Sequence, residues 1–184
     1  MATTLPTPIE FRLPEGWRPA PPDEVGAPGV AFVALHPHPD DGFTANITID
    51  AELDTAELDT AELAGTPLTE LADASIRTLR DSGADVTLAD RSEVGAGDAP
   101  GLTQTLTLRA MVNGAPRELV QSQVYLSMLD ATEPGRRAVV RLVLTASAGQ
   151  FQAVLPDFQW FVWTVRPDTG TPGTADAPEA PEAG

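Results

Sequence analysis

Hydrophobic and polar residues alternate along much of this chain, with the period of two that is typical of β-strands. This pattern, together with shorter apolar runs, predicts strands at about residues 9–13, 30–35, 43–49, 85–90, 102–110, 120–128 and 140–144. Several neighbouring strands are joined by short turns, and strands joined in that way pair in an antiparallel sheet. Residues 18–29 are rich in Pro and Gly and are predicted to form a loop.

A different period, of three to four residues, predicts a helix after residue 66. Thr66 can cap its first turn, Pro67 suits the first helical position, and Gly83 suits the end. The apolar positions that share one face are Leu68, Leu71, Ala72, Ile76 and Leu79. The helix is therefore amphipathic and is expected to pack on the sheet.

A second amphipathic helix is predicted near the C-terminal end. The apolar stripe expected to face inward is Phe151, Leu155, Phe158, Val162 and Val165. Pro156 lies within this stretch and cannot donate the backbone hydrogen bond of a helix interior, so either the helix begins near Pro156 or two turns meet there. With this stripe inward, Trp160 lies on the opposite face and Trp163 about 120° from the stripe. Phe161 flanks it.

Asn113-Gly114 marks the turn of a long hairpin, because both residues accept the positive φ angles of a tight turn. A two-residue loop pairs Leu108 with Leu119, but it splits the apolar residues of the returning strand between two faces. A three-residue loop, ending at Ala115, pairs Leu108 with Val120 and keeps one face apolar. The sequence favours the three-residue loop.

Two further segments are predicted to lie outside packed elements. The repeat Ala-Glu-Leu-Asp-Thr in residues 51–63 advances about 140° per copy on a helix, so its leucines cannot share one face and a solvated linker is expected. Residues 167–184 have the composition of a disordered acidic tail. With a flexible N-terminus at 1–8, one domain remains at 9–166. Its expected class is α+β: an antiparallel sheet of six to seven strands covered by two amphipathic helices.

Composition argues against several classes of function. The 184 residues include 27 acidic and 11 basic ones, for a formal net charge of −16, which disfavours binding to nucleic acids and anionic membranes. The chain has no Cys and no Lys, so thiol nucleophiles and Schiff bases are excluded. Without a signal-peptide pattern or a membrane-length apolar run, a cytoplasmic location is expected. The bias towards Ala, Pro, Gly and Arg indicates a high-GC genome.

Both histidines lie in one stretch, His36-Pro-His-Pro-Asp-Asp41. Part of it resembles the zinc motif of LmbE-like deacetylases, which implies His38 and Asp41 as ligands and Asp40 as base. A catalytic zinc takes about three protein ligands, and the sequence has no further histidine to complete such a site. The main interpretation is therefore a Pro-stiffened hairpin turn. No catalytic residue, metal site or cofactor is predicted.

Three features together resemble the PsbP-like fold group, and especially the actinobacterial LpqN/LpqT-type proteins. They are Phe11-Arg-Leu-Pro-Glu-Gly-Trp17, the hairpin around Asn113-Gly114, and Leu155-Pro-Asp-Phe-Gln-Trp-Phe-Val162. The resemblance spans about residues 9–166 and implies an α/β/α sandwich around an antiparallel sheet. It also implies a protein without catalytic residues, since members are mostly non-enzymatic. LpqN-type members carry a signal peptide and a lipidated Cys, which this chain lacks.

These observations favour a non-enzymatic protein-interaction or assembly module. Tryptophan is enriched at protein interfaces, so Trp160 and Trp163 are the candidate partner-binding residues, whereas Trp17 is expected in the core. Shielding of both tryptophans by the domain itself is the plainer alternative. The other functional alternatives are a small-ligand binding domain with a cleft between sheet and helix, and a metal-dependent hydrolase centred on residues 36–41.

Overall fold

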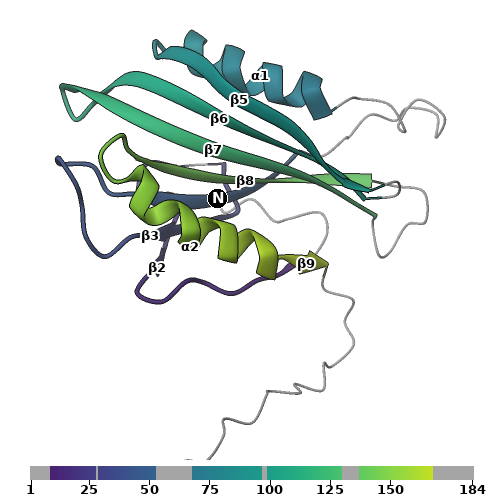
Figure 1. Ribbon diagram of the computed structural model, residues 1–184. Helices are drawn as coiled ribbons and strands as arrows, with labels where there is room; N and C mark the ends of the chain where they lie inside the picture. The colour runs from purple at the N-terminus through teal and green to yellow at the C-terminus, as the bar shows by residue number, and fades with distance from the viewer. Residues whose placement is uncertain (1–8, 28, 53–67, 97–98, 130–136, 168–184) are drawn as a thin grey trace, which may run out of the picture.

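The computed structural model describes residues 9–27, 29–52, 68–96, 99–129 and 137–167. Within them, a seven-stranded antiparallel sheet has the order β2-β3-β4-β8-β7-β6-β5, and β1 and β9 form a separate two-stranded ribbon (Figure 1). The strands are β1 (Ile9–Glu10), β2 (Arg18–Ala20), β3 (Phe32–Leu35), β4 (Asn46–Glu52), β5 (Asp85–Ala96), β6 (Ala99–Val112), β7 (Ala115–Leu129), β8 (Arg137–Ser147) and β9 (Arg166–Pro167); the helices are α1 (Leu68–Asp81) and α2 (Phe151–Thr164). The predicted α+β class is confirmed.

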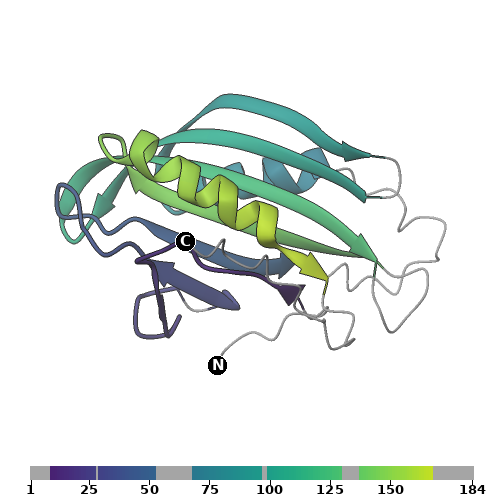
Figure 2. The same ribbon diagram turned by 60° about the horizontal axis from the view of Figure 1, so that its bottom comes forward.

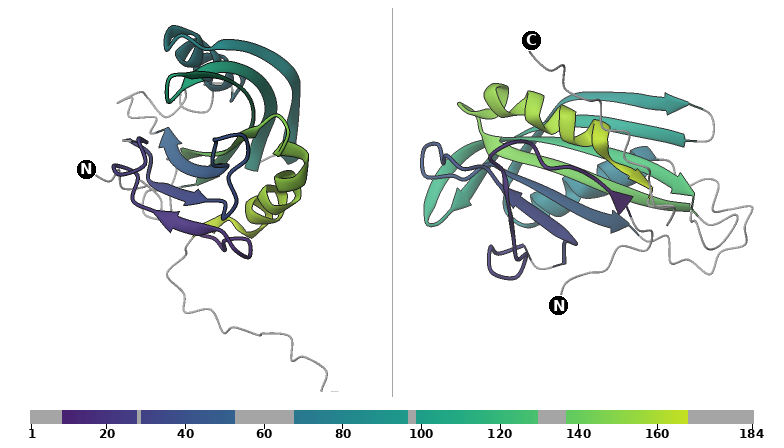
Figure 3. Two further views of the ribbon diagram at one scale, coloured as in Figure 1. Left: turned by 90° about the vertical axis from the view of Figure 1, so that its left-hand side faces the viewer. Right: turned by 90° about the horizontal axis from the view of Figure 1, so that it is seen from below.

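The two helices pack on opposite faces of the sheet, which is strongly curved (Figure 3). On β8, the side chains of Val140, Leu142 and Leu144 are fully buried in the cluster that includes α2. On the other face, α1 packs on apolar residues of β5, β6 and β7, among them Val86 and Leu106. Successive residues of a strand point to opposite faces, so the central strands β7 and β8 are buried on both sides.

The hairpin register differs from the predicted one. The loop has two residues: Val112 pairs with Ala115, and Leu108 pairs with Leu119. Asn113 and Gly114 have φ angles of 50° and 79°, as a type I′ turn requires. The prediction of a three-residue loop was wrong because it assumed that β7 has a single buried face.

The buried stripe of α2 also differs from the predicted one. The residues that α2 buries are Phe151, Val154, Phe158 and Phe161. Leu155 and Val162 are only partly buried, at the flank of the stripe, and the helix continues through Pro156. Pro156 has no N–H to donate to the carbonyl of Gln152, one turn earlier. Gln152 is on the exposed side of the helix, where water can bind that carbonyl instead.

Several smaller expectations are settled by the described residues. The hairpin of β3 and β4 and the turn between them are confirmed, and Trp17 is buried, with 5% of its surface exposed. Residues 18–29 are not all loop, because β2 pairs with β3. Strand β5 reaches Ala96 and β6 begins at Ala99, so both strands extend beyond the predicted ranges of 85–90 and 102–110. Ala51 and Glu52 are paired residues of β4 and Pro167 is a paired residue of β9, so assigning them to the linker and to the tail was wrong. The expectations for residues 1–8, 53–63, Thr66 with Pro67, and 168–184 concern parts outside the described residues.

Candidate functional site

A groove runs between the N-terminal segment of the domain and the last turns of α2. It encloses about 600 Å³ and is lined by Ile9, Glu10, Phe11, Arg12, Trp160, Trp163, Thr164 and Arg166. We call this set the Trp groove. The ribbon of β1 and β9 forms one end of it, and Figure 2 shows β9 leaving α2 directly beside β1. The structure thus brings both tryptophans singled out from the sequence into one site with the opening residues of the domain.

Both tryptophans of the groove are exposed. Trp160 exposes 44% of its surface and Trp163 exposes 72%. They are three residues apart on α2 and are therefore neighbours on one helix face. At about 25 cal/mol per Å², covering the exposed part of Trp163 would contribute roughly 3–4 kcal/mol. This apolar surface is available for an intermolecular contact.

Packing and hydrogen bonds hold the walls of the groove together. The Phe11 ring meets Phe32 and Phe161 edge to face, with centroid distances of 4.8 Å and 5.6 Å. The backbone N–H of Arg12 donates to the Thr164 hydroxyl at 2.9 Å, and that hydroxyl donates to the Phe161 carbonyl at 2.7 Å. The N-terminal wall is therefore fixed on α2, so the groove exists before any partner arrives.

The charge of the groove differs in sign from that of the chain. Among the described residues that line it, Arg12 and Arg166 are exposed, and the single carboxylate is that of Glu10. Glu10 is the cross-strand partner of Arg166, whose guanidinium lies 5.9 Å from the centre of the Trp163 ring. In a chain with a formal charge of −16, these side chains make a locally cationic and aromatic site.

The histidine-containing stretch forms the turn between β3 and β4, where Asp40 and Phe43 form an isolated bridge. The His36 ring lies edge to face on the Trp17 ring, at 5.1 Å between centroids, and Asp40 accepts a hydrogen bond from the Ser147 hydroxyl. Within the described ranges, no group of three His, Asp or Glu side chains is placed to hold a metal ion. The contacts of this stretch are those of a packed turn.

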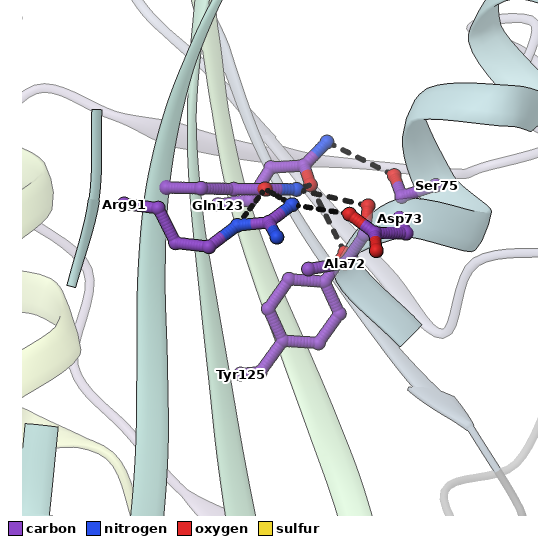
Figure 4. A network of polar contacts seen from close by, with 7 residues as sticks. Ala72, Asp73, Ser75, Arg91, Gln123 and Tyr125 are labelled. Atoms are coloured by element: carbon purple, nitrogen blue, oxygen red, sulfur yellow. Dashed lines mark hydrogen bonds and ion pairs between the residues drawn. The ribbon is translucent and has the colours of Figure 1, made fainter. Parts of the chain in front are cut away.

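A buried polar network lies between α1 and the sheet, and the sequence interpretation missed it (Figure 4). The Gln104 amide donates to the Ala72 carbonyl at 3.2 Å and to the Gln123 amide oxygen at 2.7 Å. The Gln123 amide donates to the Ser75 hydroxyl at 3.1 Å. Arg91 donates to both Gln104 and Asp73. These bonds satisfy both buried glutamines and fix α1 on the sheet.

Tyr125 belongs to the same network. Its side chain is fully buried, and its hydroxyl donates to the Gln123 amide oxygen at 3.0 Å. Burial raises the pKa of the Tyr125 phenol above its usual value of about 10, because the phenolate would lose its hydration. Hydrogen bonding and the charge of Arg141 oppose this shift only in part.

Alkaline titration of the folded chain should show this shift. Tyr125 is the chain's only tyrosine, so phenolate absorbance near 295 nm reports on it alone. We expect a midpoint above that of the chain in urea, which should lie near pH 10. Because the folded pKa is the higher one, the contribution to stability is present below about pH 10 and is lost as pH rises through the folded pKa. Equal midpoints with and without urea would contradict the buried position of the phenol.

No protein-family model and no curated protein matches the chain. Solved structures do match. Cyanobacterial PsbP from Synechocystis has a TM-score of 0.56 and 17% identity, with 91% of both chains covered. The Ran-binding protein Mog1p of Saccharomyces cerevisiae has a TM-score of 0.56 and 15% identity, covering 88% of this chain and 92% of its own. LpqN of Mycobacterium tuberculosis, involved in cell envelope biogenesis, has a TM-score of 0.52 and 16% identity, covering 85% and 81%. These matches support the expected PsbP-like fold.

No helix among the described residues has the length and apolarity needed to span a membrane.

Proposed function

We propose that this chain is a non-enzymatic protein-interaction module and that the Trp groove is its binding surface. The observation that carries the proposal is the exposure of two tryptophans on a groove whose walls are already fixed. Tryptophan and arginine are the residue types most enriched among interface residues that dominate binding energy, and the groove presents both. The structural neighbour Mog1p is a Ran-binding protein, which is consistent with protein binding by this fold.

Replacing the two exposed tryptophans tests this proposal. We expect Trp160→Ala/Trp163→Ala to weaken partner binding by about 30-fold or more, since truncating even one hot-spot tryptophan costs about 2 kcal/mol or more. The measurement is the retention of proteins from a native lysate on immobilised chain, quantified by mass spectrometry and followed by titration of the partner that is retained.

Met111 offers a matched control. It is a large apolar residue with 67% of its surface exposed, and it lies near the β6–β7 turn, at the opposite end of the sheet from β9 (Figure 1). Met111→Ala should retain the same partner as the unchanged chain. A partner retained equally by the unchanged chain and by the double Trp variant would rule out the Trp groove as its site.

A further inference from the structure

We propose that residues 168–184 of this chain bind in the Trp groove and compete there with the partner. This inference rests on the proposed function, because it names a second occupant of the same surface and thereby a means of regulating it.

The position of this segment in the chain brings it to the groove. Arg166 lines the groove, and β9 ends at Pro167, one residue before the segment begins. A flexible peptide spans on average about 5–6 Å times the square root of its residue number, which is about 18 Å for eleven residues. That distance keeps the segment close to the groove, at an effective concentration in the millimolar range.

The segment and the groove have complementary charges. Residues 168–184 contain four acidic residues and no basic one: Asp168, Asp176, Glu179 and Glu182. The groove presents Arg12 and Arg166 against the single carboxylate of Glu10. The rest of the chain is also strongly net acidic, so an acidic segment meets repulsion over most of it. Charge therefore favours the groove over most of the remaining surface.

The apolar chemistry also agrees. The segment contains Pro172, Pro178 and Pro181. Pro-containing segments bind in aromatic-lined grooves because their extended backbone is already ordered and their rings stack on aromatic side chains. Trp160 and Trp163 supply such rings beside the two arginines. A contact with a dissociation constant near 1 mM would already fill about half of the grooves, given a millimolar effective concentration.

The N-terminal residues 1–8 also adjoin the groove, because they precede Ile9. They contain two prolines but no acidic side chain, so charge complementarity does not favour them. A second copy of the chain would bring its own charge of −16 and meet overall repulsion. The segment 168–184 is therefore the occupant that charge favours most.

The absence of cysteine allows a direct test on the full chain. Ala180→Cys introduces a single thiol, which can be labelled with bimane, a dye quenched on contact with tryptophan. We expect about twofold lower emission than in the same labelled chain carrying Trp160→Phe/Trp163→Phe, as for a half-filled groove. Arg12→Gln/Arg166→Gln should restore the emission, and so should raising NaCl from about 0.05 M to about 0.5 M, which shortens the Debye length severalfold.

Three outcomes would overturn the proposal. Emission that is the same with and without the two groove tryptophans places the segment elsewhere. Quenching that rises with protein concentration identifies a second copy as the occupant. Quenching of a dye on Thr4→Cys but not on Ala180→Cys identifies residues 1–8.

A partner-binding measurement separates this inference from the proposed function. The full chain with Asp168→Asn, Asp176→Asn, Glu179→Gln and Glu182→Gln should bind the partner about twofold more tightly, because half-occupancy by a competitor halves the apparent affinity. If the Trp variants lose the partner but neutralising the four acids changes nothing, the proposed function stands and the competing segment is rejected. If dye quenching follows the predicted pattern but the unchanged chain and the double Trp variant retain the partner equally, the proposed function fails instead.

Discussion

Replacing Asp50 with Leu is expected to destabilise the fold by about 3 kcal/mol, because it leaves a largely buried arginine without its counter-charge. Asp50 and Arg141 are cross-strand partners on β4 and β8, and two guanidinium nitrogens of Arg141 donate to the two carboxylate oxygens. Only 14% of the Asp50 side chain and 24% of the Arg141 side chain are exposed. Burial lowers the pKa of Arg141, but Asp50 and Tyr125 together raise it by more, so the guanidinium stays charged.

Urea unfolding followed by far-UV circular dichroism measures this effect. Asp50→Leu combined with Arg141→Met should recover most of the lost stability, since an apolar pair of similar size removes both buried charges. The exposed pair of Arg109 and Glu118 is the matched control, with 67% and 69% of the side chains exposed. Glu118→Ala should leave the unfolding midpoint almost unchanged. If Asp50→Leu and Glu118→Ala lowered the free energy of unfolding by similar amounts, burial would not be what makes the loss of the Asp50 carboxylate costly.

Replacing Phe161 with Ala is also expected to destabilise the fold, by about 3–5 kcal/mol, for a different reason. The ring has no exposed surface, stacks on Phe158 at 6.3 Å, and supports the Phe11 ring. Alanine leaves a cavity of nearly a whole ring in the core beneath α2. A domain of this size has roughly 5–15 kcal/mol of stability in total, so either variant uses a large part of it.

Two variants on the same helix sharpen this test. Phe161→Leu should cost clearly less than Phe161→Ala, because the smaller cavity loses fewer contacts. Trp163→Ala should shift the unfolding midpoint only slightly, since 72% of its surface is already exposed. Unfolding in urea by circular dichroism compares all three. Equal effects of the changes at Phe161 and Trp163 would contradict the division of α2 into a core face and a binding face.

The fold class could be predicted because local signals agreed along most of the chain. Alternation marked β4 and β6, and the period of α1 placed Ala72 and Ile76 on its buried face. The register of β6 against β7 could not be predicted in the same way. It depends on Gln104 and Gln123 being buried as a hydrogen-bonded cross-strand pair. The predicted register instead placed Gln123 on the face of its strand opposite the apolar residues. One signal for the buried pair was present in the sequence. Gln121 and Gln123 lie on the same face of β7, and Gln123 can pair with Gln104 on β6.

The candidate site could be predicted only in part. The helical periodicity of α2 correctly placed Trp160 and Trp163 away from the core. The predicted apolar stripe was rotated relative to the observed one, so it put Phe161 at its edge, whereas Phe161 is fully buried. The other wall of the groove was not predictable. It depends on pairing between Ile9 and Pro167 across the whole domain. The alternation at residues 9–13 predicted a strand, of which only Ile9–Glu10 is paired, but nothing in the sequence named Arg166–Pro167 as its partner.

The hydrogen bond from Arg12 to Thr164 joins residues 152 positions apart. Contacts of such long sequence separation carry a high loop-closure cost and tend to form late in folding. During synthesis from the N-terminus, the wall formed by residues 9–12 has nothing to close against until α2 has left the ribosome. The Trp groove is thus a property of the finished domain, and incomplete chains lack it.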